Sequence, residues 1–395
     1  MDLKEESLKL HKEKNGKLEV KSKVKIENQH DLSLAYTPGV AYACKEIEAN
    51  PDEAYTYTSK SNMVAVITDG SAVLGLGNIG PYAAIPVMEG KSILMKELAG
   101  VDSIPICLKT QDVEEIIKTV KYLEPTLGAI NLEDISAPRC VEIERRLIKE
   151  MDIPVFHDDQ HGTSIIVAAA FLNVARLTKR KLSDMTVVMS GTGAAGSMIA
   201  KMLKKIGVGK IYASDITGVI DKKKYDSYNF LIKGLIDEGT YSTPENHDGT
   251  LKSILAGADA FIGVSAPNLV SKEMVKSMND GAIVFAMANP VPEISYTDAK
   301  EAGAYIVGSG RSDYPNQINN VLAFPGLFKG ALQVRAKKIN EEMKLAAAYA
   351  LANIISDNEL KPDYIVPGAF DKRVVPAVAK AVADAAIKTG VARIK

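Results

Sequence analysis

A regular alternation of short apolar runs with longer helical patterns constrains the fold of this 395-residue chain more than any other feature. From about residue 60 onward, runs of five to seven residues are each followed by a stretch with helical periodicity. Parallel strands joined by helices produce this pattern, because helices cover both faces of such a sheet. We therefore predict a doubly wound α/β fold with strands at 63–69, 103–108, 128–133, 153–157, 186–190, 210–215, 259–265, 282–288 and 304–308.

A glycine-rich turn follows the strand predicted at 186–190 and leads into a helical pattern. Its residues are Gly191, Thr192, Gly193, Ala194, Ala195 and Gly196. Such a turn lets a pyrophosphate approach the free N–H groups at the start of a helix. Asp215 ends the next predicted strand, where a carboxylate can bind a ribose 2′-hydroxyl and repel a 2′-phosphate. The unit predicts a Rossmann-type domain that binds NAD, with NADP left open, in preference to a plain turn between strand and helix.

A second glycine motif, Gly75-Leu-Gly77-Asn-Ile-Gly80, has a different context. Pro81 follows its third glycine directly, and no acidic residue ends the next predicted strand. The two features that mark a dinucleotide site are therefore missing. We expect this motif to shape a backbone loop near the substrate instead of binding a second nucleotide.

The chain is long enough for two to three domains, and two sets of strand–helix units are visible. We predict a substrate- and metal-binding α/β domain over residues 1–160 and an NAD-binding domain over residues 161–320. The remaining residues, 321–395, are rich in alanine and helical in pattern, with a break near 361–368. We expect this helical C-terminal segment to complete the first domain.

Composition excludes several classes of protein. The 48 basic and 49 acidic side chains leave a net charge of −1, which argues against a nucleic-acid or anionic-membrane binder. The longest apolar runs, 165–172 and 345–352, are eight residues long, whereas a membrane span needs about 20. The three scattered cysteines are typical of reduced thiols in a cytoplasmic protein.

The first 30 residues are rich in lysine. Leu3, Leu8 and Leu10 indicate a short amphipathic helix, and the alternating segment 17–26 predicts a strand or hairpin arm. Acidic residues interrupt the lysines, so a solvated or oligomer-facing arm is favoured over a basic binding site.

Two pairs of acidic residues stand at the ends of predicted strands. Glu133-Asp134 ends the strand at 128–133, and Asp158-Asp159 follows the strand at 153–157. Ligands of open α/β sheets collect at the carboxyl ends of strands, so both pairs can line one crevice. Three or four carboxylates suit Mg²⁺ or Mn²⁺ better than zinc. The alternative is that Asp134 and Asp159 cap the helices that follow.

Spacing alone nominates neither Tyr36 nor Lys91, since a single lysine is usually solvated and a single tyrosine usually belongs to the core. Asn289 ends a predicted strand, and Asn319 and Asn320 precede a Phe-Pro-Gly turn. Asparagine at such points usually forms a turn, although the end of a strand also allows a role in ligand binding.

Eight segments nevertheless occur in an order that closely resembles the malic enzymes in their compact bacterial and archaeal form. The resemblance runs from about residue 15 to the C-terminus. The segments are SLAYTPGVA (33–41), TDGSAVLGLGNIGP ending at Pro81, EGKSILMK (89–96), NLEDISAP (131–138), VFHDDQHGT (155–163), SGTGAAG (190–196), MANP (287–290) and NQINNVLAFPG (316–326).

The resemblance implies oxidative decarboxylation of L-malate to pyruvate and CO₂, with reduction of NAD or NADP and a requirement for Mg²⁺ or Mn²⁺. It implies that Tyr36 is the general acid and Lys91 the general base. An ordinary lysine is a poor base at neutral pH, so this role needs a lowered pKa for Lys91. The resemblance further assigns metal binding to Glu133, Asp134 and Asp159, and substrate or cofactor contacts to Asn289, Asn319 and Asn320.

The same resemblance implies a homodimer, which agrees with an arm-like N-terminus. One position departs from the family's pattern: larger relatives carry an arginine two residues after the TDG motif to hold the substrate carboxylate, and Ala72 stands there in this chain. Three alternatives stay open. They are a malolactic-type enzyme that releases lactate and retains NAD, an amino-acid dehydrogenase of similar layout that needs no metal, and a catalytically inactive NAD-binding sensor.

Overall fold

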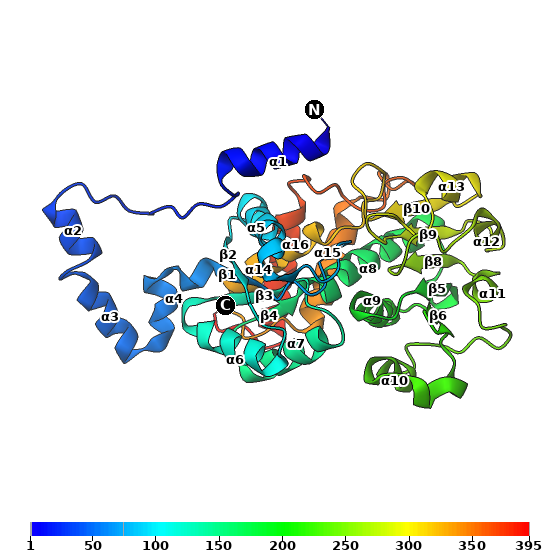
Figure 1. Ribbon diagram of the computed structural model, residues 1–395, viewed down its shortest axis with the longest axis horizontal. Coiled ribbons are helices and arrows are strands. Elements are labelled where there is room, and N and C mark those ends of the chain that lie inside the picture. The colour runs from blue at the N-terminus through cyan, green and yellow to red at the C-terminus, as the bar shows by residue number, and fades with distance from the viewer. Residues whose placement is uncertain (1, 74, 395) are drawn as a thin grey trace.

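The computed structural model of the protein describes residues 2–73 and 75–394, and within them the chain forms two sheets, one parallel and one mostly parallel (Figure 1). The first sheet has four strands in the order β2-β1-β3-β4, all parallel. These strands are β1 (Met63–Thr68), β2 (Asp102–Cys107), β3 (Ala129–Leu132) and β4 (Val155–His157).

Helices cover both faces of this first sheet, which explains why β1 is apolar at five consecutive positions, 63–67. Ala65 and Ile67 of β1 pack against α6 (Val113–Leu123) and α7 (Arg139–Glu150). Val64 and Val66 belong to the core on the opposite face, together with α5 (Gly80–Ala99) and α8 (Asp158–Thr178). Successive side chains of a strand point to opposite faces, so every position of β1 from Val64 onward is buried.

The second sheet has six strands in the order β10-β9-β8-β5-β6-β7. All pairs are parallel except β6 with β7, which is antiparallel. Its strands are β5 (Thr186–Ser190), β6 (Lys210–Asp215), β7 (Gly218–Val219), β8 (Ala260–Gly263), β9 (Ile283–Ala286) and β10 (Ile306–Ser309). Its helices are α9 (Ala194–Lys205), α10 (Phe230–Asp237), α11 (Leu251–Leu255), α12 (Lys272–Lys276) and α13 (Tyr296–Glu301). The prediction of an α/β fold with a Rossmann-like part is confirmed.

Helix α8 runs between the two sheets and is buried along most of its length. Its core residues join those of three C-terminal helices, α14 (Phe324–Gln333), α15 (Glu341–Ile354) and α16 (Val374–Lys388). The predicted helical C-terminal segment is therefore confirmed, with a wider break than expected between α15 and α16. None of the helices in the described residues is long and apolar enough to cross a membrane.

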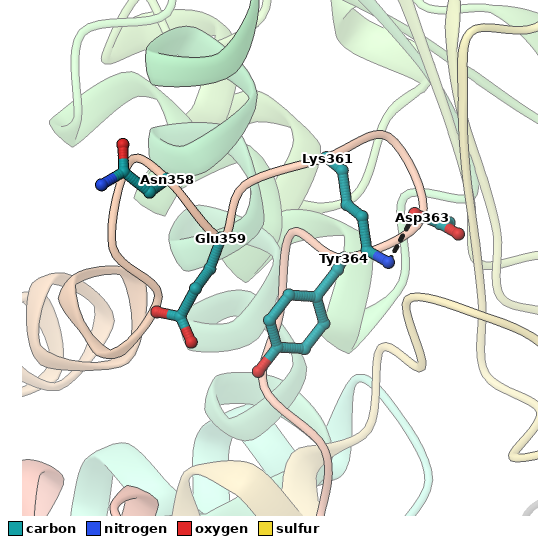
Figure 2. A pocket seen from close by; sticks show the side chains of 5 residues that line it. All are labelled: Asn358, Glu359, Lys361, Asp363 and Tyr364. Carbon is teal, nitrogen blue, oxygen red and sulfur yellow. Dashed lines mark ion pairs between the residues drawn. The ribbon is translucent and has the colours of Figure 1, made fainter.

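The segment between α15 and α16 borders a surface hollow lined by Asn358, Glu359, Lys361, Asp363 and Tyr364 (Figure 2). Buried Asn316 ties this segment to the second sheet. Its Nδ2 donates to the carbonyls of Val307 and Pro362, and its Oδ1 accepts the N–H of Ile365. The C-terminal segment thus holds the loop that leads to Asn319 and Asn320.

The residues before β1 form α1 (Leu3–Lys14), α2 (Gln29–Ala35), α3 (Val40–Ala49) and α4 (Ala54–Tyr57). Helices α2 and α3 form an arm that extends away from the body of the molecule (Figure 1). The segment after α1 lies against α5, because the N–H of Lys17 donates to Oε2 of Glu89 at 3.0 Å. The predicted amphipathic helix is present as α1, but the strand predicted at 17–26 is wrong, because all ten residues are described and none lies in a strand. Alternation alone cannot form a strand when no neighbouring strand offers its backbone groups.

Candidate active site

Lys91 lies within an acidic cluster at the carboxyl edge of the first sheet. Helix α5 carries its side chain toward the loops that follow β3 and β4. Its Nζ is 2.5 Å from Oδ2 of Asp158 and 3.0 Å from Oε1 of Glu133, and all three side chains are buried or nearly so. The ammonium group also lies 4.8 Å from the centre of the Phe324 ring. This lysine is not solvated, unlike the usual single lysine.

The electrostatic environment of Lys91 is set by these carboxylates. Burial alone would lower its pKa, but Asp158, Glu133 and Asp159 outweigh burial and hold the pKa above its ordinary value. Burial and the neighbouring acids together raise the pKa of Glu133. The lowered pKa that a general base needs therefore does not come from burial of Lys91. A cation that neutralised the surrounding carboxylates would shift the pKa of Lys91 downward.

Three carboxylates beside Lys91 form a candidate metal centre. Glu133, Asp134 and Asp159 each offer an oxygen, and these oxygens lie within 4.8 Å of one another. The backbone N–H of Asp134 donates to Oδ2 of Asp159 at 2.8 Å, and Nδ2 of Asn131 donates to Oε2 of Glu133 at 2.9 Å. Hard oxygen donors of this kind fit Mg²⁺ or Mn²⁺.

The backbone explains how adjacent acids reach one site. Asp134 has a φ of 54°, a left-handed conformation that breaks the alternation of the strand just after β3. The alternative role of Asp134 and Asp159 as helix caps is wrong, because the N-cap residues of α7 and α8 are Pro138 and His157. Neither acid is therefore the N-cap of the helix that follows it.

Asp158 is a site residue to which the sequence interpretation assigned no separate role. Helix α8 begins at Asp158, four residues before the predicted start, so both aspartates lie in its first turn. A side chain at Gly162 would place its Cβ 2.2 Å from Oδ1 of Asp158. The spacing of an aspartate and a glycine four residues apart was the signal available in the sequence, because these positions face each other on a helix.

The predicted asparagines lie around this cluster with different surroundings. Asn319 accepts the N–H of Val321 through its side chain, which is the role of a turn former. The Cβ of Asn320 lies 2.7 Å from where a Cβ of Gly162 would be, so Asn320 sits against the first turn of α8. Asn289 lies on the second sheet's side, where Nδ2 donates to the carbonyl of Met287 at 3.4 Å.

The glycine loop over 75–80 lies close to the turn at Pro290, which follows a strand of the second sheet. Gly75, Gly77 and Gly80 all have φ near 74°, which L side chains rarely adopt. A Cβ on Gly75 would lie 3.1 Å from the ring of Pro290, the residue after Asn289. The loop therefore passes against the turn that carries Asn289, as expected of a backbone-shaping segment.

The predicted dinucleotide turn has the geometry that its sequence indicates. Gly191 follows β5 with a φ of 106°, Gly193 is the N-cap of α9, and a Cβ on Gly196 would lie 2.0 Å from the carbonyl oxygen of Gly191. Asp215 ends β6. Its carboxylate accepts hydrogen bonds from Thr217 and from Oγ1 of Thr192, so it is held beside the turn.

Tyr36 lies elsewhere. It follows α2 on the N-terminal arm as the C-cap residue, and 66% of it is exposed. Figure 1 shows α2 well away from α5, which carries Lys91. A single chain therefore brings together Lys91 and the predicted metal ligands but leaves Tyr36 outside this cluster.

The loop at Ala72 has an arginine close by, although it comes from α7. Nη2 of Arg139 is 2.9 Å from Asp69 Oδ2, from Ser71 Oγ and from Ser136 Oγ. The N–H of Ala72 donates to the carbonyl of Asp134 at 2.9 Å. Arg139 thus joins the two loops beside the acidic cluster.

Comparison with known proteins agrees with this architecture. Residues 15–148 match the family described as malic enzyme, N-terminal domain, and residues 160–387 match the malic enzyme, NAD binding domain. The first range contains Lys91, Glu133 and Asp134, and the second contains the glycine-rich turn, whereas Asp158 and Asp159 lie between the two ranges.

Individual relatives are similar along nearly the whole chain. A bifunctional malic/malolactic enzyme of Bacillus subtilis is 56% identical over 100% of this chain and 95% of its own length. An NAD-dependent malic enzyme of Geobacillus stearothermophilus is 53% identical over 96% of this chain and 78% of its own length. The crystal structure of malic enzyme from Pyrococcus horikoshii matches with a TM-score of 0.93 and 44% identity, covering 100% of this chain and 92% of that one. The chain belongs to the malic enzyme family.

Proposed function

We propose that this protein catalyses the oxidative decarboxylation of L-malate to pyruvate and CO₂, with reduction of NAD and a requirement for Mg²⁺ or Mn²⁺. The observation that carries the proposal is the position of Lys91, 3.0 Å from Glu133 and beside three carboxylates that share one site. A proton acceptor next to a cation site is what oxidation of a hydroxy acid needs. Membership of the malic enzyme family supports the same reaction.

In the proposed mechanism, Glu133, Asp134 and Asp159 hold the divalent cation. When bound, the cation supplies Lewis acidity that stabilises negative charge on the substrate oxygen as CO₂ leaves. Lys91, as the neutral amine, accepts the proton of the 2-hydroxyl group while hydride passes to the nicotinamide, and Asp158 orients the Lys91 amino group through its 2.5 Å contact. Tyr36 then protonates carbon 3 of enolpyruvate. Asn289 and Asn320 contact the substrate or the nicotinamide side of the cleft, and Asn319 shapes the turn beside them.

The domain assignment follows from these roles. Residues 1–160 with 321–395 bind substrate and metal, and residues 161–320 bind the dinucleotide. Asp215 beside the glycine turn favours NAD over NADP, because its carboxylate would repel a 2′-phosphate. The three free cysteines support a cytoplasmic location.

We further propose that the active form is a homodimer in which the arm contacts the second copy. Within the described residues α2 and α3 bury no side chain, and Leu34, Tyr36 and Tyr42 are more than 60% exposed. Apolar side chains on an extended arm are stabilised by contact with another surface. Tyr36 serves as the general acid if this contact carries it to Lys91 of the second copy.

The decisive experiment is a spectrophotometric assay of malate with NAD or NADP, with and without Mn²⁺. We expect NADH and pyruvate to form in equal amounts, and we expect a chelator to stop the reaction. Malate turnover that persists in excess chelator would contradict the proposal and favour a metal-independent dehydrogenase. A protein that binds NAD but never turns over malate would be a sensor.

A malolactic reaction is the second candidate, because the Bacillus subtilis relative is named a bifunctional malic/malolactic enzyme. In that reaction lactate leaves and NAD is retained, so no free NADH accumulates. Measuring lactate and NADH in the same sample separates the two reactions. Lactate without NADH would replace the oxidative reaction with the malolactic one.

A further inference from the structure

A buried carboxylate on α7 contacts the first turn of α8, the turn that carries Asp158 and Asp159. Glu144 of α7 is only 4% exposed, and its Oε1 accepts the backbone N–H of His157 at 2.8 Å. Its Oε2 accepts a hydrogen bond from Nε2 of Gln160 at 3.2 Å and contacts Nε2 of His161 at 2.9 Å. One carboxylate therefore binds three residues that enclose Asp158 and Asp159.

The charge of Glu144 is balanced from a distant part of the chain. Nζ of Lys344, on α15, is 3.1 Å from Nδ1 of His161 and 2.8 Å from Oε1 of Glu341. Lys205, on α9 of the second sheet, contacts the other oxygen of Glu341 at 2.7 Å. Although burial alone would raise the pKa of Glu144, His161 and Lys344 bring it down to about 2, so the group is a carboxylate at neutral pH.

This arrangement is more specific than the packing of two helices requires. A buried carboxylate costs desolvation energy, which an apolar side chain between α7 and α8 would avoid. The hydrogen bonds of Glu144 do not run along α7, and all three go to residues 157–161. A group that accepts hydrogen bonds on both sides of Asp158 and Asp159 restrains the direction in which their carboxylates leave the helix.

We propose that Glu144 is a positioning residue that sets the affinity of the acidic cluster for its divalent cation, by holding the first turn of α8 so that Asp159 faces Glu133 and Asp134. The inference rests on the metal centre proposed above. Outer groups that orient metal ligands typically change metal affinity about 10- to 100-fold when they are removed. Glu144 contacts the ligand-bearing turn and none of the predicted ligands themselves.

The experiment measures Mn²⁺ binding to the full-length protein, stripped of metal with a chelator, by electron paramagnetic resonance of the free ion. Glu144→Gln keeps one oxygen for the N–H of His157 but turns an amide toward the donors of Gln160 and His161. We expect the Kd for Mn²⁺ to rise about 10-fold or more in this variant. The Kd for NAD, measured by titration calorimetry, should stay unchanged because the glycine turn lies on the other sheet.

The matched control is Glu142→Gln, an exposed position on the same helix whose Oε1 lies 3.6 Å from Nη1 of Arg146. It should bind Mn²⁺ as the wild-type protein does. A folded Glu144→Gln protein with an unchanged Kd for Mn²⁺ would overturn the inference, as would an equal loss of Mn²⁺ and NAD affinity, which indicates general loosening.

Two further outcomes are also decisive. If Glu144→Gln fails to fold, Gln160→Met removes a single hydrogen bond to Glu144, and the same comparison of Mn²⁺ with NAD applies to it with a smaller expected rise. If the wild-type protein binds no Mn²⁺, or if Asp159→Asn binds it equally well, the metal centre itself is wrong and the inference falls with it. Wild-type binding that Asp159→Asn weakens and Glu144→Gln does not overturns the inference alone.

Discussion

The acidic cluster and the N-terminal arm both carry residues proposed for catalysis, yet they are built in opposite ways. In the cluster, Nζ of Lys91 and Oε1 of Glu133 are 3.0 Å apart. Lys91 lies on α5, which packs on the first sheet, and Glu133 directly follows the buried strand β3. On the arm, Tyr36 is 66% exposed at the end of a seven-residue helix with no buried side chain in the described structure.

The two regions differ in which contacts hold their side chains in place. The cluster needs only the fold of one chain, because β3, α5 and α8 are packed together whether or not a second copy is present. The arm exposes Leu34 and Tyr42 and needs a surface that the same chain does not supply in the described residues. Metal binding should therefore survive changes that abolish assembly, whereas proton transfer by Tyr36 should not.

The largest expected effect is the loss of Lys91. Lys91→Met should lower kcat for malate oxidation by about 10²–10⁴-fold, because the hydroxyl proton then has no acceptor. NAD binding should persist, since the glycine turn belongs to the second sheet. Steady-state kinetics with calorimetry measure both, and a folded variant with wild-type kcat would remove Lys91 from the mechanism.

Tyr36 provides the sharpest test of the comparison. Tyr36→Phe should lower pyruvate formation by about 10²-fold or more while Mn²⁺ binding stays at the wild-type value. If the arm serves the second copy, refolding a mixture of Tyr36→Phe and Lys91→Met chains should restore about a quarter of wild-type activity, because half of the dimers then hold one intact site. No recovery in dimers shown to be mixed would mean that the arm serves its own chain.

The pH dependence of the free energy of unfolding tests Glu144, which supports the acidic cluster and has no counterpart proposed on the arm. The pKa of Glu144 is about 2 in the folded protein against an ordinary 4.5, so its contribution is complete well above pH 4.5 and is lost as the pH falls toward 2. Between pH 5 and pH 3 this single group should remove about 2 kcal/mol from the free energy of unfolding. Urea unfolding of wild type and Glu144→Gln checks this, because the variant should lack that part of the pH dependence. An identical pH dependence in both proteins would contradict it.

The smallest expected effect concerns the arm surface. Leu34→Asp should weaken dimerisation by about 1–3 kcal/mol, because an apolar side chain buried at the contact is replaced by a charge. Sedimentation at several concentrations measures the change, and Mn²⁺ binding should not respond. The exposed Leu76→Asp, outside the arm, is the control, and equal effects of the two changes would argue against the arm as the contact.

Much of the fold was predictable because it depends on local patterns. The runs 63–67 and 187–189 are apolar at consecutive positions, which is typical of strands covered on both faces, and both form parallel strands. The segment 17–26 instead alternates between charged and apolar residues, yet none of its residues is buried and none lies in a strand. Periodicity describes one segment, whereas a strand needs a partner that periodicity does not identify.

The candidate site was predictable to the extent that its residues follow strands. Glu133 and Asp159 were expected in one crevice, because the carboxyl ends of parallel strands share an edge. Lys91 entered only through the resemblance to a family, since nothing in its own segment distinguishes a buried lysine from a solvated one. Asp158 and Glu144 acquire their roles from contacts across 67 and 13 residues of chain, respectively, which no local pattern records.

By itself the sequence determined the parallel α/β architecture, the glycine turn before α9 with Asp215 at the end of the next strand, and the kind of ligand that the acidic residues can bind. These properties depend on neighbours in the chain, on backbone sterics and on the chemistry of single side chains. Only the tertiary structure decided that Lys91 is paired with Asp158, that Glu144 supports the first turn of α8, and that Tyr36 stands apart on an arm. Those properties depend on distances between segments far apart in the chain, and folding alone sets such distances.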